Sequence, residues 1–344
     1  MLINKGIKFK NFMVWSLPHY ILISIFMGAI TLLYHYKIIS VTIPWLPISV
    51  IGTAVAFYVG FKNNQAYDRL WEARKTWGGI INDSRSWGMM VDGFVTNQFT
   101  TTDATADELK SIKKRLIYRH IAWLYAHRSQ LLISTPWEGS NQRGFFKKRA
   151  KYLQKKFGIG LLDDEITKTE LHHFLPENEY SQLVNTVNTA TQIINQQSKD
   201  LTLLREASII EDFRHMELTK ILQNFYTLQG KNERIKKFPL PRQYANMSRV
   251  FVFIFIFLIP FSMTPELMKA ADWSIWLSIP LSALIGWVYR MMELVGDYSE
   301  NPFQSIATDI PMMSICRTIE IDLREMLGET DLPLAINAKK DVLM

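Results

Sequence analysis

The chain has 344 residues, of which 48% are hydrophobic and 21% are charged, with a formal net charge of +7. That length suits two soluble domains or one large membrane protein with a soluble part. The only cysteine, Cys316, excludes an internal disulfide and any cysteine-based zinc or iron–sulfur site. The seven histidines never occur with HxxxH or HExxH spacing. We therefore expect no metal site and no cofactor.

The first two predicted elements are membrane-spanning helices, at about residues 13–34 and 45–61. At about 1.5 Å per residue, helices of this length cross a hydrocarbon core about 30 Å thick. Pro18 and Pro47 are tolerated in a membrane bundle because neighbouring helices satisfy the freed backbone groups. The second run is short and carries Thr53, so a buried helix in a soluble core is its alternative.

The long central segment, residues 62–246, predicts a bundle of helices. Apolar residues recur there at helical spacing and strand signals are absent. The stripes are Leu116, Ile117, His120, Ile121, Leu124 and Tyr125, and then Leu201, Leu204, Ile209 and Phe213. Breaks are expected near residues 96–106, 134–144, 156–163 and 230–241. A basic run at residues 147–156 is interpreted as a solvated helix face, with phosphate or lipid binding as its alternative.

Two further membrane spans follow, at about residues 247–263 and 273–292. The third predicted span contains the most apolar stretch of the chain, since residues 250–261 include no polar side chain. Tryptophans at 45, 273, 276 and 287 are suited to the interfacial belts of a membrane protein. These observations predict an all-α membrane protein with four transmembrane helices.

The distribution of lysine and arginine predicts an orientation. The two short loops between paired spans contain only Lys37 and Lys269, whereas residues 62–242 carry 28 lysines and arginines. By the positive-inside tendency, both termini and residues 62–246 and 293–344 are expected in the cytoplasm, with the spans in a plasma membrane such as the bacterial inner membrane. The net charge then belongs to a cytosolic region beside anionic lipid, and no nucleic-acid partner is expected.

Three strings resemble the bestrophin family, particularly its bacterial members. They are GFKNNQAYDRLWEARKTWGGIINDSRSW at residues 60–87, LQGKNERIKKFPLPRQYA at 228–245, and ELVGDYSENPFQSIATDIPMMSICRTIEIDLREMLGE at 293–329. Together with the four-span layout, the resemblance covers nearly all of residues 1–344 as one subunit. It implies a homopentamer around a central pore lined by the second span, with a helical cytosolic bundle.

The resemblance also implies passive conduction of small monovalent ions and no enzymatic activity. Many animal bestrophins favour chloride, while bacterial relatives include candidates for cation conduction. The expected partners are further copies of the chain, membrane lipid and small inorganic ions. Selectivity between anions and cations is not predicted from the residues.

The candidate pore neck is Thr53, Phe57 and Phe61. Residues four apart share a helix face, so five copies of these side chains would form stacked rings that gate by dewetting. The family's neck is similarly lined by bulky apolar residues four apart, from which the polar Thr53 departs. Two alternatives remain: ordinary packing of these aromatics, and a pore stripe made by Val50, Ala54 and Tyr58.

A candidate pore exit follows the neck. Asn63, Asn64 and Gln65 are suited either to rehydrating an ion or to satisfying backbone groups at a helix end, and Asn64 is the chosen candidate. The resemblance implies a second apolar constriction near Phe213, with Ile209 and Ile210 as nearby choices.

Animal bestrophins carry a calcium clasp built largely from an acidic run just after an Asn-Pro-Phe motif. Here that motif occupies residues 301–303 and is followed by QSIATDIP, in which Asp309 is the only acidic residue. Calcium requires about six to eight oxygen ligands. We therefore expect no bestrophin-type calcium activation.

Three other functions compete with a channel. A secondary transporter is disfavoured because no repeat is visible and the spans contain no acidic residue before Glu293. A non-conducting membrane scaffold is compatible with the sequence. A membrane enzyme would depend on the carboxylates of Asp68, Glu72, Asp83 and Glu293, which are expected instead to pair with Arg69, Arg74 and Arg85.

Overall fold

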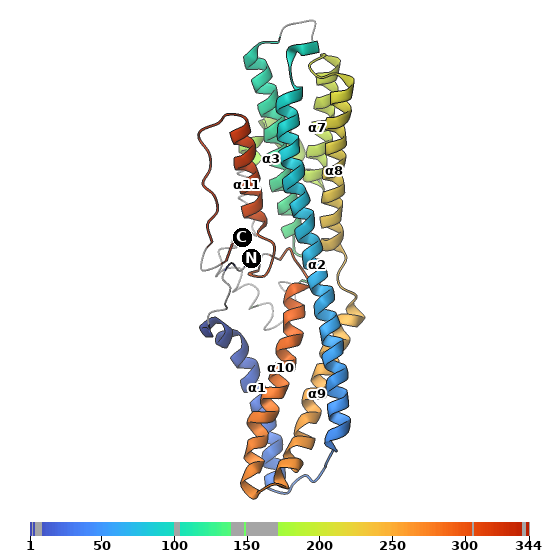
Figure 1. Ribbon diagram of the computed structural model, residues 1–344, viewed down its shortest axis with the longest axis vertical. Coiled ribbons are helices and arrows are strands. Elements are labelled where there is room, and N and C mark those ends of the chain that lie inside the picture. Colours follow the sequence, from blue (N-terminus) through green and yellow to red (C-terminus); the bar gives the residue numbers. More distant parts are fainter. Residues whose placement is uncertain are drawn as a thin grey trace. The chain divides into compact units, whose positions relative to one another are not determined.

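The computed structural model describes residues 1, 3, 9–99, 104–138, 148, 171–304, 306–338 and 342–343. The predicted breaks at residues 139–144 and 156–163 and nearly all of the basic run at 147–156 lie outside the described residues. The described elements are helices, as predicted, and they form two compact units (Figure 1). The apolar unit comprises residues 4–69 and 239–300, and the polar unit comprises residues 1–3, 70–238 and 301–344.

The longest helix, α2 (Trp45–Phe94), contributes to both units (Figure 1). The predicted second span, about residues 45–61, occupies its first part, and the helix continues without a break to Phe94, just before the predicted break at 96–106. Two consecutive glycines, Gly78 and Gly79, lie within it. A Cβ on Gly79 would lie 3.0 Å from the Leu228 side chain, so this glycine permits close packing of α2 against another helix and does not end the helix.

The apolar unit is a bundle of α1 (Phe9–His35), the first half of α2, α9 (Arg242–Met268) and α10 (Ser278–Ser299). A short helix, η3 (Asp272–Leu277), precedes α10. Helix α1 packs against both α9 and α10, and α9 packs against α10. Among the described residues, four helices are long and apolar enough to cross a membrane, and they include the four predicted spans.

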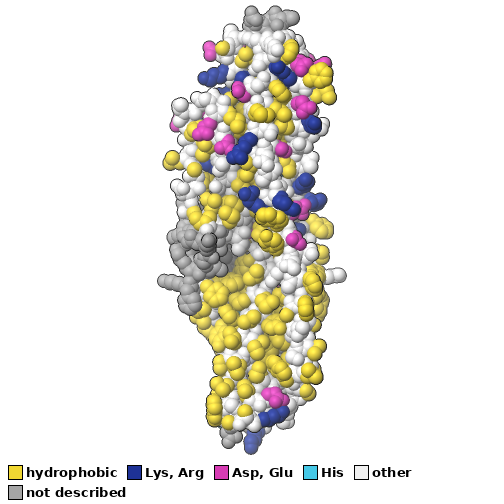
Figure 2. Space-filling model, in the orientation of Figure 1, with side chains coloured by type: hydrophobic (Ala, Val, Ile, Leu, Met, Phe, Trp, Pro, Cys, Tyr) yellow, Lys and Arg dark blue, Asp and Glu magenta, His cyan; other side chains and the backbone are white. Residues whose placement is uncertain are grey.

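Large apolar side chains cover the outside of the apolar unit, as Figure 2 shows on its visible face. Leu22, in α1, is 67% exposed. Leu46, in α2, is 73% exposed, and Phe253, in α9, is 68% exposed. Apolar coverage this extensive is unfavourable in water and suits contact with lipid or with further copies of the chain. Between the helices the contacts include small polar residues, such as the pair Thr31 and Ser278, whose hydroxyl oxygens are 2.9 Å apart.

Helix α1 ends in a glycine-type cap that has a lysine at its key position. Lys37 adopts a left-handed backbone with φ of 56°. Its N–H donates to Tyr34 O and the next N–H, of Ile38, donates to Leu33 O, which is the Schellman pattern. A residue with a side chain adopts this conformation at a cost of about 1 kcal/mol relative to glycine.

The polar unit contains η1 (Asn97–Phe99), α3 (Ala106–Leu132), α6 (Glu177–Val184), α7 (Thr189–Glu206), α8 (Asp212–Lys237), α11 (Met312–Met326) and the second half of α2. Helix α3 packs against α7, α8 and α11. Thr105 forms a capping box with Glu108 that starts α3 within the predicted break.

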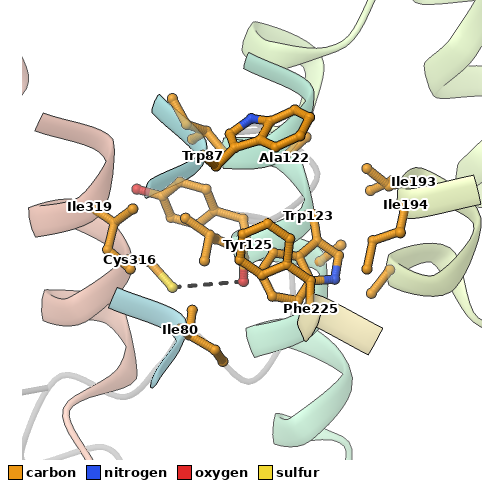
Figure 3. Packing of buried hydrophobic residues seen from close by; sticks show 14 of the residues in the cluster. Ile80, Trp87, Ala122, Trp123, Tyr125, Ile193, Ile194, Phe225, Cys316 and Ile319 are labelled. Carbon is orange, nitrogen blue, oxygen red and sulfur yellow. Dashed lines mark hydrogen bonds between the residues drawn. The ribbon is translucent and has the colours of Figure 1, made fainter. Parts of the chain in front are cut away.

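Aromatic residues fill the core of the polar unit (Figure 3). Trp87, Trp123, Tyr125 and Phe225 are each at most 1% exposed. The hydroxyl of Tyr125 donates to Glu320 over 2.6 Å, which satisfies this buried polar group. The single cysteine, Cys316, lies in the same core, and its buried thiol donates to Leu124 O over 3.7 Å (Figure 3).

The predicted stripe of Leu201, Leu204, Ile209 and Phe213 is only partly confirmed. Leu201 and Leu204 are buried in the core on α7. The helix ends at Glu206 and a new helix begins at Asp212, so Phe213 does not continue the stripe. Its side chain is 76% exposed, and its assignment to a helical core face was wrong.

Candidate functional site

Within the apolar unit, helix α2 has an inward face and an outward face. The inward face is buried and has the spacing of four and three residues that one helix stripe requires: Ile48, Gly52, Val55, Val59, Lys62 and Ala66. The outward face carries the predicted neck, since Thr53 is exposed and Phe57 and Phe61 are 65% and 62% exposed. The neck residues thus share one face, and that face is exposed among the residues that the structure describes.

A close contact at Gly52 fixes this rotation of α2 near its start. A Cβ on this residue would lie 2.8 Å from Phe255 Cε2, so only glycine allows α9 to approach so closely. The hydroxyl of Tyr289, on α10, donates to Gly52 O over 3.0 Å. Rotating α2 would break this hydrogen bond and drive backbone into the Phe255 ring.

A buried ion cluster fixes the rotation again at the end of the predicted span. The Lys62 side chain is 0% exposed, and its Nζ lies 2.6 Å from Asp297 Oδ1 and 3.2 Å from Glu293 Oε1 on α10. Arg290 also pairs with Glu293, and Arg249, on α9, lies 3.3 Å from Asp297. Three cations therefore surround two carboxylates directly behind Phe61, and the group joins α2, α9 and α10.

The same region contains a second close approach. A Cβ on Gly296 would lie 2.3 Å from Asn63 Oδ1, and the Nδ2 of Asn63 donates to Met292 O over 3.0 Å. Asn63 thus bonds a backbone carbonyl inside α10, and not one at a helix end as the sequence suggested. Asn64 and Gln65 are exposed and continue the outward face.

The polar group of Thr53 is satisfied within its own helix. Its hydroxyl donates to Ser49 O over 3.0 Å. The remaining outward surface of Thr53 is consequently closer to that of an aliphatic residue than its residue type suggests. Thr53 therefore differs less from the apolar residues expected in the neck than its residue type suggests.

The alternative stripe has mixed surroundings. Val50 is 61% exposed and Ala54 is exposed, but the Tyr58 ring is half-buried against Tyr244 and Phe251. The Tyr58 hydroxyl donates to Tyr244 O over 3.1 Å. Only two of the three residues therefore offer a free outward surface.

In the polar unit, the three candidates for the second constriction differ in exposure. Ile210 is 1% exposed and belongs to the core, and Ile209 packs against that core. Phe213, in the first turn of α8, is 76% exposed. Of the three, Phe213 has the surface that a ring around an axis would need.

The carboxylates weighed as enzymatic candidates have other partners than those expected. Glu293 pairs with Lys62 and Arg290. Glu72 pairs with Arg234, and Arg85 pairs with Asp322. For Glu293 the expected pairing with Arg69, Arg74 or Arg85 was wrong, because α10 places its carboxylate beside Lys62 and Arg290. Glu72 and Arg85 each have a partner on another helix, α8 and α11.

The loop after the Asn-Pro-Phe motif is held by Asp309. This side chain is 3% exposed, and its Oδ2 accepts the N–H groups of Gln304, at 2.6 Å, and Ile306, at 3.2 Å. Burial raises the pKa of Asp309 to about 7. The carboxylate thus serves as an internal latch of the loop and does not face solvent as a calcium ligand would.

We predict that calcium does not activate the protein. The only carboxylate in the eight residues after the motif is committed to two backbone N–H groups, and calcium needs about six to eight oxygen ligands. Ion flux in chelator and in micromolar calcium should therefore agree within error. A steep, reversible rise of flux with calcium would contradict this assignment of Asp309.

Comparison with known proteins gives consistent matches. The family model for the bacterial and fungal bestrophin protein matches residues 11–325. A voltage-dependent anion channel-forming protein of Escherichia coli, YneE, is 22% identical over 309 residues, which are 90% of this chain and 85% of that protein. A protein of the same description from Ralstonia nicotianae is 26% identical and covers 87% of this chain and 82% of its own length. Among solved structures, a bacterial bestrophin homolog from Klebsiella pneumoniae superposes with a TM-score of 0.71 at 20% identity, over 92% of this chain and 99% of that one.

Proposed function

Because this chain belongs to the bacterial and fungal bestrophin family, we propose that it is a passive anion channel whose pore is lined by the outward face of α2. The observation that carries the proposal is an apolar helix face, Thr53 to Phe61, that is exposed in the single chain although buried contacts on the opposite face hold it in place. Five such faces around one axis would form the neck. No enzymatic reaction is part of the proposal.

Two features favour anions. Cation-selective pores commonly use rings of Asp or Glu, whereas residues 45–67 of α2 contain no acidic residue. The relatives from Escherichia coli and Ralstonia nicotianae are described as anion channel-forming. We propose chloride as the test ion for this chain.

Selectivity is measured in proteoliposomes that hold the purified protein across a potassium chloride gradient. The reversal potential should move toward that of chloride, and replacing chloride with gluconate should remove most of the current. Replacing potassium with a large organic cation is the matched control and should change the current little. A reversal potential that follows potassium would overturn the anion assignment while leaving the channel itself in place.

We propose a homopentamer with four spans per subunit, of about residues 13–34, 45–61, 247–263 and 273–292, and with residues 62–246 and 293–344 in the cytoplasm. The polar side chains of Asn64 and Gln65 lie on the outward face of α2, next to large apolar side chains. They directly follow the proposed second span, and polar side chains at that point are accommodated at the cytoplasmic mouth of a water-filled axis. A closed ring with heterologous contacts provides that axis.

We predict that the protein purified in mild detergent contains five subunits of 40.1 kDa each. Native mass measurement gives the count directly, after the bound detergent is removed in the gas phase. Light scattering with separate determination of the detergent mass provides the control. A stable monomer or dimer with full ion flux would contradict a neck shared by five copies of α2.

Topology is open to a separate test. Both termini are proposed to be cytoplasmic in a bacterial inner membrane, and Lys37 and Lys269 would then lie on the outer side. A cysteine introduced at Lys37 should react with a membrane-impermeant thiol reagent in whole cells, whereas the native Cys316 is buried and should not. Labelling of a cysteine at position 37 only after cell lysis would reverse the orientation.

A further inference from the structure

The lysines of the two short loops meet in one pocket of the apolar unit. Lys37 and Lys269 are the only basic residues in segments 36–44 and 269–272, which are far apart in the sequence. Both line a cavity of about 430 Å³, together with Ser40 and Thr42. Cavities of about 300–1,000 Å³ are typical of small-ligand sites. The lysines of both short loops thus line the same pocket.

The lining combines charge with apolar surface. The side chains of Ile39 and Met268 contribute to the wall, next to the hydroxyl groups and the two ammonium groups. Met268 is the last residue of α9, and Lys37 follows the last turn of α1, so the pocket lies where two membrane helices end. The ends of membrane helices lie at the level of the lipid head groups, which carry phosphate.

The two cations are unequally neutralised. Nζ of Lys269 lies 2.8 Å from Glu266, in an exposed ion pair. Lys37 has no carboxylate partner among the residues that the structure describes. The pocket therefore keeps an excess of positive charge.

The backbone at Lys37 adds an independent observation. Its φ of 56° is one that glycine adopts freely and that a side chain opposes. The hydrogen bonds of this cap involve only the backbone, so the lysine side chain contributes nothing to them. A lysine at this position supplies a charge to the pocket that the fold itself does not need.

We propose that this pocket binds a phosphate-bearing anion, with the ammonium groups of Lys37 and Lys269 and the hydroxyls of Ser40 and Thr42 facing the phosphate. Ammonium groups bind phosphate as point charges, and hydroxyls donate to its oxygens. The apolar wall at Ile39 and Met268 suits the glycerol and first methylenes of a phospholipid. The two sources of this chemistry are an anionic phospholipid head group and free inorganic phosphate.

The pivotal variant is Lys37→Gly, which removes a charge and relieves the backbone at the same time. A loss of binding in this variant has no explanation in misfolding, because glycine is the favoured residue in that cap. Lys37→Arg keeps the charge, and Lys269→Gln removes the second one. Lys75→Gln, at an exposed lysine of α2 outside the pocket, is the matched control.

Binding is measured on the detergent-solubilised oligomer by native mass spectrometry, in separate arms with phosphatidylglycerol, phosphatidylcholine and inorganic phosphate. At about 1 kcal/mol per lysine near phosphate, each removal should weaken binding about fivefold. The double variant Lys37→Gly with Lys269→Gln should lose about 30-fold, while Lys37→Arg and Lys75→Gln should bind as the natural chain does. Glu266→Gln, which frees Lys269, should bind more tightly.

The three ligands distinguish a lipid head group from free phosphate as the bound anion. Phosphatidylglycerol binding that is sensitive to the lysines identifies a lipid head group, and an equal effect on inorganic phosphate identifies the free anion. Phosphatidylglycerol and phosphate affinities unchanged in the double variant would overturn the proposal. So would equal affinity for phosphatidylcholine, or loss of the oligomer in the Lys37→Gly variant, which would make this surface a contact between subunits.

Discussion

Replacing Phe57 or Phe61 with alanine should raise ion flux at least about tenfold, equivalent to lowering the barrier by about 1.4 kcal/mol. Each aromatic ring, repeated around the pore axis, leaves little room for a hydrated ion and offers no hydrogen bonds in exchange for lost water. Dewetting then sets the barrier, and a smaller side chain lowers it without introducing charge. Flux from proteoliposomes and single-channel closed times measure the effect.

The competing expectation is that these rings only pack. A buried Phe→Ala change costs roughly 3–5 kcal/mol of stability. Both side chains are more than 60% exposed in the subunit, so their truncation should leave the thermal stability of the subunit nearly unchanged.

The matched control is Phe255→Ala, because Phe255 is 3% exposed and packs against α2 at Gly52. That variant should lose stability by the amount expected for a buried ring, and it shows what truncation of Phe57 or Phe61 would look like if those rings only packed. Unchanged conductance together with a weakened oligomer in Phe57→Ala and Phe61→Ala would reassign these rings to contacts between subunits. The pore lining would then be reassigned to Val50, Ala54 and Tyr58. In that stripe the Tyr58 hydroxyl donates a hydrogen bond to Tyr244 O.

The membrane helices could be predicted because their signal is local. A run such as residues 250–261, without a polar side chain, needs no knowledge of distant residues. Charged residues after Phe61 mark the end of the apolar run but not the end of the helix, and α2 continues to Phe94, just before the predicted break at 96–106. Whether a pair of glycines interrupts a helix depends on what packs there, and Leu228 is far from Gly79 in the sequence.

Periodicity also predicted that Phe57 and Phe61 share one face of α2. It did not predict the contacts on the opposite face that hold them outward. The cluster around Lys62 depends on α10 lying beside α2, which no local pattern shows. A usable signal was present: Glu293 and Asp297 are four residues apart, so they share a face at the end of a span that has no other acidic residue. A carboxylate pair at that depth needs a cation from another helix. Lys62 is the lysine that directly follows the second predicted span, at the matching depth.

We expect Lys62→Met to lower the stability of the protein more than any substitution on the outward face. Removing one partner of a buried ion pair costs about 3–5 kcal/mol, because the other charge stays buried without its partner. Glu293 is 0% exposed, and only Arg290 and Arg249, whose side chains are both partly exposed, would remain beside its carboxylate. In a protein of this size, each kcal/mol of lost unfolding free energy lowers the thermal midpoint by about 2–4 °C, so the midpoint of Lys62→Met should fall by about 10 °C.

The double variant Lys62→Met with Glu293→Met separates the charge from the packing. Replacing both ions with apolar side chains of similar volume is often close to neutral, so this variant should recover most of the loss in Lys62→Met. A double-mutant cycle completed with Glu293→Met gives the coupling between the two side chains. Lys75→Met, at an exposed lysine of the same helix, should leave the midpoint unchanged.

The same variants test whether the cluster sets the rotation of the neck. Lys62 and Phe61 are neighbours on opposite faces of α2, so a helix no longer held at Lys62 is free to turn the Phe61 ring away from the axis. Lys62→Met should therefore alter flux as well as stability. The double variant should recover stability without recovering the natural flux, because methionine packing specifies rotation less strictly than two directed ion pairs. A Lys62→Met protein with an unchanged thermal midpoint and unchanged flux would show that Gly52 and its contacts hold α2 without the cluster.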